Sequence, residues 1–549
     1  MIICLSACQN DGTGQPGDQP NNENILHPFA FHPETVTISV ARQLNLGNPL
    51  AEGVTTSDNI YIDVIKEKLN VQVIIDWETI PQDYSRRLAL AIANDTLPDV
   101  FVLEMREFPV FQWLVENGKL ADLTDAYNHA IGGYDALYLS MLDGSQNEMF
   151  IVDGRLMAIP AIPTGYNFNV LWVRQDWLDK LNLPVPRTTD EIRDTALAFI
   201  RNNLGGPNTQ GIVINPDPIL GSSGSFLTLS TVAHASGAYP TEWILDSDGK
   251  VTYGSIMPEM YDALAVLKDW YQAGVLDPRF MSYPDMDAVT PAIRDGRCGM
   301  FFGAYWSPYI VGYSTEDHET LWTPVIAPLD ESGIFNHTNN RSSGSFLVVS
   351  SNVQCEIAAI QAINVAFELQ RGAYNNNPEI KAEVDRLLAA GSFGRTINPF
   401  PGSLSGMFDE EARRGVSYMQ FLETGVLDYI PGLPIESIKE HADKILAWYN
   451  SDRIARTDTE LENRILYESY KTIASIYQYE NRHEQPIAFN GFTSSMTEYW
   501  PALWELERQA IIQIVSGEKM LDHFFEFAFR WRNMGGDIII EEIQAILDS

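Results

Sequence analysis

Four side chains suited to binding a polar solute follow predicted strands near the start of the chain: Arg42, Trp77, Glu104 and Arg106. Charged groups offer strong hydrogen bonds, and an aromatic ring offers a flat apolar plate. Together they bind molecules that have both hydroxyl groups and apolar faces. The chemistry that these residue types offer is therefore recognition of a small polar molecule.

The elements that must position these side chains alternate between strand and helix. Short β-branched or apolar runs predict strands at residues 35–40, 71–75 and 100–103. Apolar residues at helical spacing predict the two helices between them, one with Tyr61, Val64, Ile65 and Lys68 on one face and one with Tyr84, Leu88, Ala91 and Ile92. This alternation predicts a parallel sheet covered by helices, and ligands bind beyond the carboxyl ends of such strands.

The sequence contains none of the standard catalytic motifs. It has no His-Glu-x-x-His zinc motif, no Gly-x-Ser-x-Gly nucleophile elbow and no phosphate-binding loop ending in Gly-Lys-Ser/Thr. No standard catalytic signature is therefore present, which makes an enzyme the less favoured interpretation.

Charge and length narrow the possible classes of protein further. With 549 residues, the chain is too long for one compact core and must form at least two domains. The 73 acidic residues against 36 Lys and Arg give a net charge of -37, which repels nucleic acid and anionic lipid. We therefore expect no nucleic-acid partner.

The first residues resemble an export signal. Leu5-Ser6-Ala7-Cys8 is similar to the lipobox of bacterial lipoproteins, in which cleavage leaves a lipidated cysteine at the N-terminus. We expect residues 1–7 to be a truncated signal remnant, because a full signal needs a longer apolar stretch. Residues 8–34 are predicted to be a lipidated, flexible tether. Cys8 is accordingly the predicted lipidation site, and the lipid the predicted contact with the membrane.

A second region of interest is the hexapeptide Ser-Ser-Gly-Ser-Phe-Leu. It occurs at residues 222–227 and again at 342–347, but the flanking sequences differ and show no repeat. Its small, donor-rich residues suit either a loop that lines a ligand or an ordinary turn. The ordinary turn is the preferred interpretation.

Several short motifs, in a fixed order, resemble the extracellular solute-binding protein family 1. They span about residues 35–549, and similarity is greatest to the large lipoproteins like LipO and to alginate-binding proteins. The motifs are Leu97-Pro98-Asp99-Val100, Asn117 to Leu123, Asp153 to Pro160, Val173 to Leu181, Trp270 to Pro278, Asp295 to Met300, and Met496 to Gly536.

The resemblance implies an α/β, two-lobe, periplasmic-binding-protein-like fold of type II. Each lobe would be a mostly parallel sheet covered by helices, with a hinge between the lobes. We expect lobe 1 to comprise residues 35–155 and 345–395, and lobe 2 residues 156–344 and 396–549.

The resemblance also implies a role in import. The protein would act as a monomer on the extracytoplasmic face of the cell membrane, bind a sugar between its lobes and deliver it to the transmembrane subunits of an ABC permease. Trp306 and Trp500 match the positions where relatives stack tryptophan on sugar rings. Tyr166 and Trp77 are further aromatic candidates, and Arg42, Glu104 and Arg106 are the polar ones.

One departure from the family concerns calcium. Relatives near the alginate binders often carry an acidic calcium loop where this chain has residues 202–210. That stretch contains no carboxylate, and calcium sites require several oxygen ligands, usually including carboxylates. We therefore expect no metal there, and no cofactor elsewhere.

The residues leave two alternatives and the ligand open. A secreted carbohydrate-active enzyme would share the composition and need only two suitably placed carboxylates. A receptor lipoprotein that feeds a sensor would share fold and ligand. The solute itself could be a neutral oligosaccharide, a uronide favoured by Arg42 and Arg106, or a non-sugar.

Overall fold

Two units make up the chain. The computed structural model describes residues 26–44, 50–132, 149–161, 165–222, 224–311, 321–339, 344–400, 409–428, 430 and 435–548. Unit 1 comprises residues 1–164, 341–408 and 429–438, and unit 2 comprises residues 165–340, 409–428 and 439–549. The lobe boundaries given above stay a prediction. Residues 1–7, most of the predicted tether and Cys8 lie outside the described residues.

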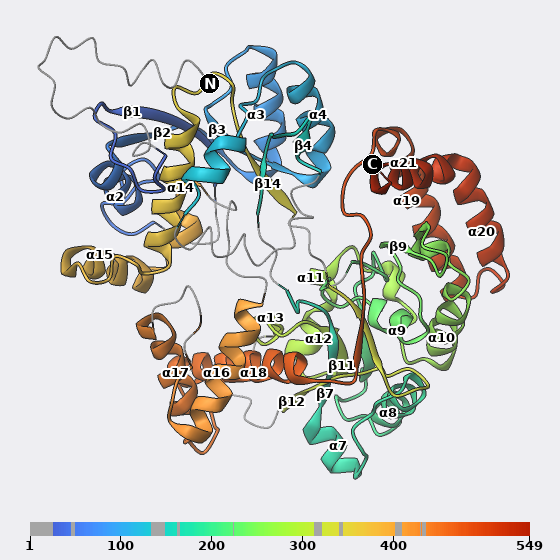
Figure 1. Ribbon diagram of the computed structural model, residues 1–549. Helices are drawn as coiled ribbons and strands as arrows, with labels where there is room; N and C mark the ends of the chain where they lie inside the picture. Colours follow the sequence, from blue (N-terminus) through green and yellow to red (C-terminus); the bar gives the residue numbers. More distant parts are fainter. Residues whose placement is uncertain are drawn as a thin grey trace, which may run out of the picture. The chain divides into compact units, whose positions relative to one another are not determined.

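Unit 1 is built on a five-stranded sheet. In spatial order its strands are β2 (Val71–Thr79), β1 (Val36–Gln43), β3 (Val100–Glu104), β14 (Ser345–Val349) and β6 (Ile159–Pro160). β1 runs parallel to β2 and β3, so Gln43, Thr79 and Glu104 end their strands at the same edge. β14 comes from a distant part of the chain and lies between β3 and β6, antiparallel to both (Figure 1).

Helices cover this sheet, and local sequence accounts for them. The side chain of Asn59 caps the first helix by accepting a hydrogen bond from the Tyr61 N–H, and Asn70 ends it in the left-handed conformation. Tyr61, Val64 and Ile65 are buried as predicted. The helices of this unit are α2 (Ile60–Leu69), α3 (Pro81–Ala93), α4 (Phe108–Glu116), α14 (Glu356–Gln370) and α15 (Pro378–Ala389), with short turns at Met105–Glu107, Ala126–Ala130 and Gly394–Thr396 and a hairpin of β4 (Ile151–Val152) and β5 (Arg155–Leu156).

Unit 2 contains a four-stranded sheet and two smaller strand pairs. The sheet has the order β12 (Trp322–Val325), β7 (Val170–Arg174), β11 (Cys298–Gly303) and β8 (Gln210–Val213). β7 is antiparallel to β12 and β11, and β11 is parallel to β8. β9 (Trp243–Leu245) and β10 (Val251–Tyr253) form a hairpin, and β13 (Phe335–Thr338) pairs in parallel with β15 (Arg482–Gln485).

The helices of unit 2 come from three stretches of the chain. α8 begins with a capping box of Thr188 and Glu191, and α10 ends at Gly274, as the sequence predicts. The helices of this unit are α7 (Gln175–Leu181), α8 (Thr189–Arg201), α9 (Ser230–Ala235), α10 (Met260–Ala273), α11 (Met286–Val289), α12 (Pro291–Arg294), α13 (Pro308–Val311), α16 (Glu410–Thr424), α18 (Asp458–Gln478), α19 (Ser494–Val515), α20 (His523–Trp531) and α21 (Asp537–Leu547), with short turns at Gly254–Ile256, Phe280–Ser282 and Arg532–Gly536. α17 (Ile435–Tyr449) begins in unit 1 and belongs to unit 2 from Lys439 on.

Strand direction differs from the prediction of mostly parallel sheets. The α/β composition of both units is as predicted, but β14 in unit 1 and β7 in unit 2 run against their neighbours. Each is the first strand of the large sheet after the chain changes unit, at 340/341 and 164/165 respectively. Such a strand does not follow a helical crossover from a neighbour in the same sheet, so the rule that makes strand-helix-strand units parallel does not apply to it.

The C-terminal helices complete the core of unit 2. Figure 1 shows α19, α20 and α21 grouped together, and α19 packs against α10. Leu503, Ile514 and Trp531 are fully buried there with Trp270 of α10. The chain after α19 turns at Gly517, which has a positive φ of 81°, where the sequence predicts the helix to stop. These helices therefore belong to the folded body of the unit.

Candidate functional site

Two segments of unit 2 are held together: the one that enters from unit 1 and the one that returns to it. Tyr166 follows the change at 164/165 and Asn339 precedes the one at 340/341. The backbone N–H of Tyr166 donates to Asn339 Oδ1 at 3.0 Å. Tyr166 has a φ of 57°, a left-handed conformation that is unfavourable for a bulky residue and is kept by its surroundings. Strain of this kind is common at ligand-binding positions.

An aromatic and cationic cluster surrounds the Tyr166 ring. The ring of Tyr477 meets it edge-to-face with centroids 5.0 Å apart, and the Arg482 guanidinium lies 5.0 Å from its centroid. Burial raises the pKa of Tyr166, although Arg482 opposes the shift, so its hydroxyl stays protonated at neutral pH. Arg482 is fixed by a 2.8 Å hydrogen bond to the carbonyl of Ile476. The cluster thus offers hydroxyl and guanidinium hydrogen bonds beside an aromatic face.

Trp306 lies in the loop after β11 and reaches the same segment. Its indole Nε1 donates to Asn167 Oδ1 at 2.6 Å, which fixes the ring plane. Its ring packs at 5.6 Å from that of Phe226 and remains half-buried. Two predicted residues, Tyr166 and Trp306, are therefore linked through Asn167, and Trp306 keeps part of its surface open.

Trp500 belongs to a different part of unit 2. It packs at 5.7 Å from Trp243 and edge-to-face at 5.4 Å from Tyr253, against the core that includes Trp531. Trp306 packs against a separate cluster around Phe226 and Phe301. The structure does not bring the two tryptophans into one cluster, and the role of Trp500 in stacking stays a prediction.

The polar candidates of unit 1 lie at the edge where β1 and β3 end. Gln43 Nε2 donates to Glu104 Oε1 at 3.4 Å, and the backbone N–H of Glu104 donates to Glu107 at 3.0 Å. Trp77 is 9 % exposed and packs at 5.2 Å from Tyr84. Arg106 lies in the turn at Met105–Glu107, and its side chain is outside the described residues.

Arg42 holds unit 1 together from inside. It is 1 % exposed, and its Nη2 donates to the carbonyl of Thr396 at 2.8 Å. Its Nε lies 3.7 Å from a carboxylate oxygen of Glu78. As placed, the guanidinium does not reach the surface, so the structure offers no support for a contact between Arg42 and a solute.

Sequence reasoning missed Asn167, Asn339, Tyr477 and Arg482. Arg482 lies beside Tyr166 because β15 pairs with β13, a partner far away in the sequence. Asn167 carried a weak signal, since it follows the proline-rich stretch at which the chain was predicted to change lobes. Nothing local in the sequence distinguished the other three from ordinary surface residues.

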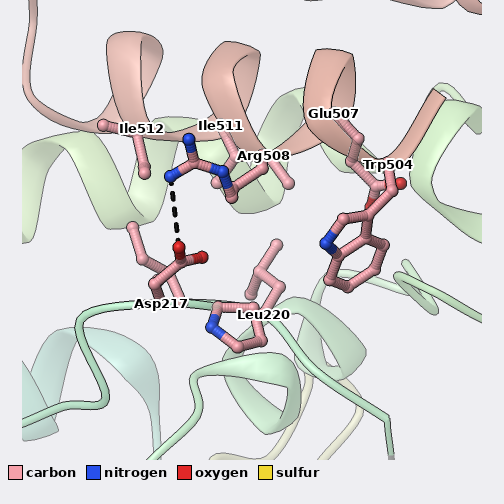
Figure 2. A pocket seen from close by; sticks show the side chains of 9 residues that line it. Asp217, Leu220, Trp504, Glu507, Arg508, Ile511 and Ile512 are labelled. Atoms are coloured by element: carbon pink, nitrogen blue, oxygen red, sulfur yellow. Dashed lines mark hydrogen bonds and ion pairs between the residues drawn. The ribbon is translucent and has the colours of Figure 1, made fainter. Parts of the chain in front are cut away.

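A separate pocket lies between α19 and the loop at Asp217 (Figure 2). Arg508 Nη1 bonds to Asp217 at 3.1 Å across it, and Leu220 and Trp504 are among the residues that line it. Glu507 lines the pocket too but is only 3 % exposed, and it accepts a 2.8 Å hydrogen bond from Tyr253. Burial raises the pKa of the Glu507 carboxyl to about 7.

The described residues contain neither a metal-binding cluster nor a membrane-spanning helix. No group of three or more His, Cys, Asp or Glu side chains in that part of the chain could hold a metal ion. Nor does any helix among those residues have the length and apolar character needed to cross a membrane. Cys298 and Cys355 are both buried, as small core residues usually are.

Comparison with known proteins decides the family. Residues 55–350, more than half of the chain, match the family described as bacterial extracellular solute-binding protein. The chain belongs to this family. Among relatives, this solute-binding protein is 22 % identical over 338 residues to the fructooligosaccharide ABC transporter substrate-binding protein FusA of Streptococcus pneumoniae, covering 59 % of each chain. It is 26 % identical over 257 residues to the polygalacturonan/rhamnogalacturonan-binding protein YtcQ of Bacillus subtilis, covering 44 % of this chain and 46 % of that one.

Solved structures extend the likeness over nearly the whole chain. FusA in complex with kestose has a TM-score of 0.60 at 13 % identity, covering 93 % of this chain and 99 % of the other. Alginate-binding protein AlgQ2 without calcium has a TM-score of 0.57 at 14 % identity, covering 94 % and 98 %. The two-lobe type II fold predicted for this solute-binding protein is confirmed, as is the resemblance that predicted it.

The buried position of Arg42 predicts that replacing this residue destabilises the fold. Arg42→Met should lower the free energy of unfolding by about 2 kcal/mol, because it removes a charge-assisted hydrogen bond and the positive charge beside Glu78. Urea denaturation measures this. Arg86→Met is the matched control, since the Arg86 pair with Asp83 is exposed and should contribute little. Equal stability of the two variants would contradict the structural role.

Glu507 predicts a pH dependence of stability. Because the folded-state pKa is raised to about 7, the native state binds the extra proton between pH 4.5 and 7, and stability falls as pH rises through that window. Over the window the loss is about 3 kcal/mol. Glu507→Gln keeps an acceptor for Tyr253 and should abolish this part of the slope, measured as denaturation midpoints at pH 5 and 8. Parallel pH profiles for the two proteins would refute the prediction.

Proposed function

We propose that this protein binds a carbohydrate outside the cytoplasm and delivers it to an ABC permease. The observation that carries the proposal is the half-buried Trp306 plate, fixed by Asn167 next to Tyr166 and Arg482 in a chain of a solute-binding family. Sugars have apolar C–H faces for such a plate and hydroxyls for the polar groups beside it. The names of FusA, a fructooligosaccharide binder, and YtcQ, a polygalacturonan/rhamnogalacturonan binder, support a carbohydrate as the ligand.

A neutral oligosaccharide is the form of solute that we favour. The uronide alternative depended on Arg42 and Arg106, and Arg42 is buried and bonded to Thr396. The prediction that the solute lies in a cleft between the two lobes stays a prediction. So does the action of the protein as a monomer that performs no reaction on its ligand.

The sugar assignment is tested by thermal shift with the protein lacking residues 1–23. Kestose, maltotriose, cellotriose, trigalacturonate and a tripeptide form the panel, and each hit is recovered and analysed. At least one trisaccharide should raise the melting temperature, because a ligand that binds only the folded state stabilises it. Recovery of the ligand intact fits a binding protein, while cleaved ligand would favour the enzyme. A panel with no stabilising sugar would overturn the assignment.

Trp306 is the residue to change. Trp306→Ala should weaken sugar binding by about 2 kcal/mol, or roughly thirty-fold, as loss of a central tryptophan does. Trp306→Phe keeps an aromatic plate but lacks the N–H that donates to Asn167. Its affinity should lie between those of the wild type and Trp306→Ala. Trp113→Ala is the control, since Trp113 is 45 % exposed in unit 1 and should leave affinity unchanged. Titration calorimetry gives the affinities, and unaltered binding by Trp306→Ala would remove this residue from the site.

We also propose that Cys8 anchors the protein to the membrane by a lipid. The Leu-Ser-Ala-Cys motif and the polar residues after it support this. Protein isolated from membranes of the native cell should begin at a diacylated Cys8, which mass spectrometry of the N-terminal peptide detects. An unmodified N-terminus elsewhere in the chain would show that the motif is not processed.

A further inference from the structure

The aromatic surface at Trp306 continues one turn further along the chain. The backbone N–H of Tyr309, in α13, donates to the carbonyl of Trp306 at 3.0 Å, which closes a tight turn. Side chains three residues apart in such a turn lie on the same side of the chain. Tyr309 is 55 % exposed, and Trp306 is half-buried. Two aromatic rings with open surface therefore follow each other on one side of this turn.

Helices α16 and α18 support the turn. α13 packs against α18, and α18 packs against α16 (Figure 1). Near the start of α16, Glu411 accepts a hydrogen bond of 3.0 Å from the Tyr470 hydroxyl of α18 and lies 3.6 Å from Arg414 Nη1. The Glu411 side chain keeps 25 % of its surface exposed. Its carboxylate is therefore fixed in place but can still accept hydrogen bonds from a solute.

Glu411 also lies near the tyrosines of the turn. The pKa of Tyr309 is raised to about 12, first by desolvation, because the surrounding protein excludes part of the water, and then by Glu411 and Glu462. The pKa of Tyr305, the residue before Trp306, is raised by burial and next by Glu411. Effects of this kind require a charge close to the ring. The partly open Tyr309 ring thus has a fixed carboxylate beside it.

This combination suits a second sugar ring. A tyrosine ring offers an apolar plate for C–H groups, and the Glu411 carboxylate accepts hydrogen bonds from hydroxyl groups. A carboxylate on the ligand would be repelled there, because Arg414 is already paired with Glu410 at 2.7 Å. A single exposed aromatic residue on a protein surface needs no explanation. Here the exposed ring follows the Trp306 plate by one turn, and this spacing points to a longer ligand.

We propose that Tyr309 is a second stacking plate, so that the site holds two successive rings of an oligosaccharide, one on Trp306 and one on Tyr309 with its hydroxyls at Glu411. The inference rests on the proposed function, because it assigns a place to the second ring of the sugar held at Trp306. Tyr309 is then the residue that makes the protein prefer sugar chains to single sugars.

Chain length is the readout of the test. Titration calorimetry with kestose, maltotriose and cellotriose gives the trisaccharide affinities, and displacement of the bound trisaccharide gives those of glucose and fructose. Wild-type protein should bind its trisaccharide at least about ten-fold more tightly than the monosaccharides. Tyr309→Ala should weaken trisaccharide binding about ten-fold and leave monosaccharide binding unchanged, because a single ring occupies the Trp306 plate. Trp306→Ala should weaken both.

Two further variants control for other effects. Tyr309→Phe keeps the plate and should bind sugars of both lengths like wild type. Phe529→Ala is the matched control for loss of an exposed aromatic ring, because Phe529 is 69 % exposed on α20 of the same unit. It should leave the affinities for both lengths unchanged.

The outcomes separate the second plate from the function. If no carbohydrate binds wild-type protein, the sugar assignment and the second plate both fall. If wild type binds monosaccharides as tightly as trisaccharides, or if Tyr309→Ala weakens neither or weakens both equally, only the second plate is overturned. Should Tyr309→Ala not fold, Tyr309→Leu keeps apolar bulk without a flat ring and should show the same loss for trisaccharides alone.

Discussion

The hydrogen bond from the Tyr166 N–H to Asn339 ties together the two segments next to the first unit changes of the chain. The surrounding arrangement depends on it. β13 ends at Thr338, directly before Asn339, and pairs with β15, which places Arg482 over the Tyr166 ring. The residue after Tyr166 fixes the Trp306 indole. A strained tyrosine is kept at this point because several elements of unit 2 hold it from different sides.

Neutral and charged groups have separate positions in the described structure. The acidic excess lies mainly at the surface, where most ion pairs are exposed and contribute little each. Among the buried groups, Arg42 is paired with Thr396, and burial keeps His234 and His337 uncharged at neutral pH.

The regular elements were largely predictable from the sequence. Tyr61, Val64 and Ile65 face the core because an apolar pattern of period 3.6 has a single buried face, and α10 ends at Gly274 because glycine accepts the left-handed conformation. The directions of β7 and β14 were not predictable in this way. They depend on how the chain returns to a sheet from another unit, and no local pattern records that path.

For the candidate site, too, the sequence predicted some features and not others. The sequence by itself determined the family, the alternation of strands and helices, and the place of Trp306 directly after a buried strand, since each depends on residues near one another in the chain. Only the tertiary structure decided that Arg42 is buried and that Arg482 and Asn339 join Tyr166. Burial and long-range pairing arise from the packing of distant segments, whereas caps and periodicity are encoded within single segments.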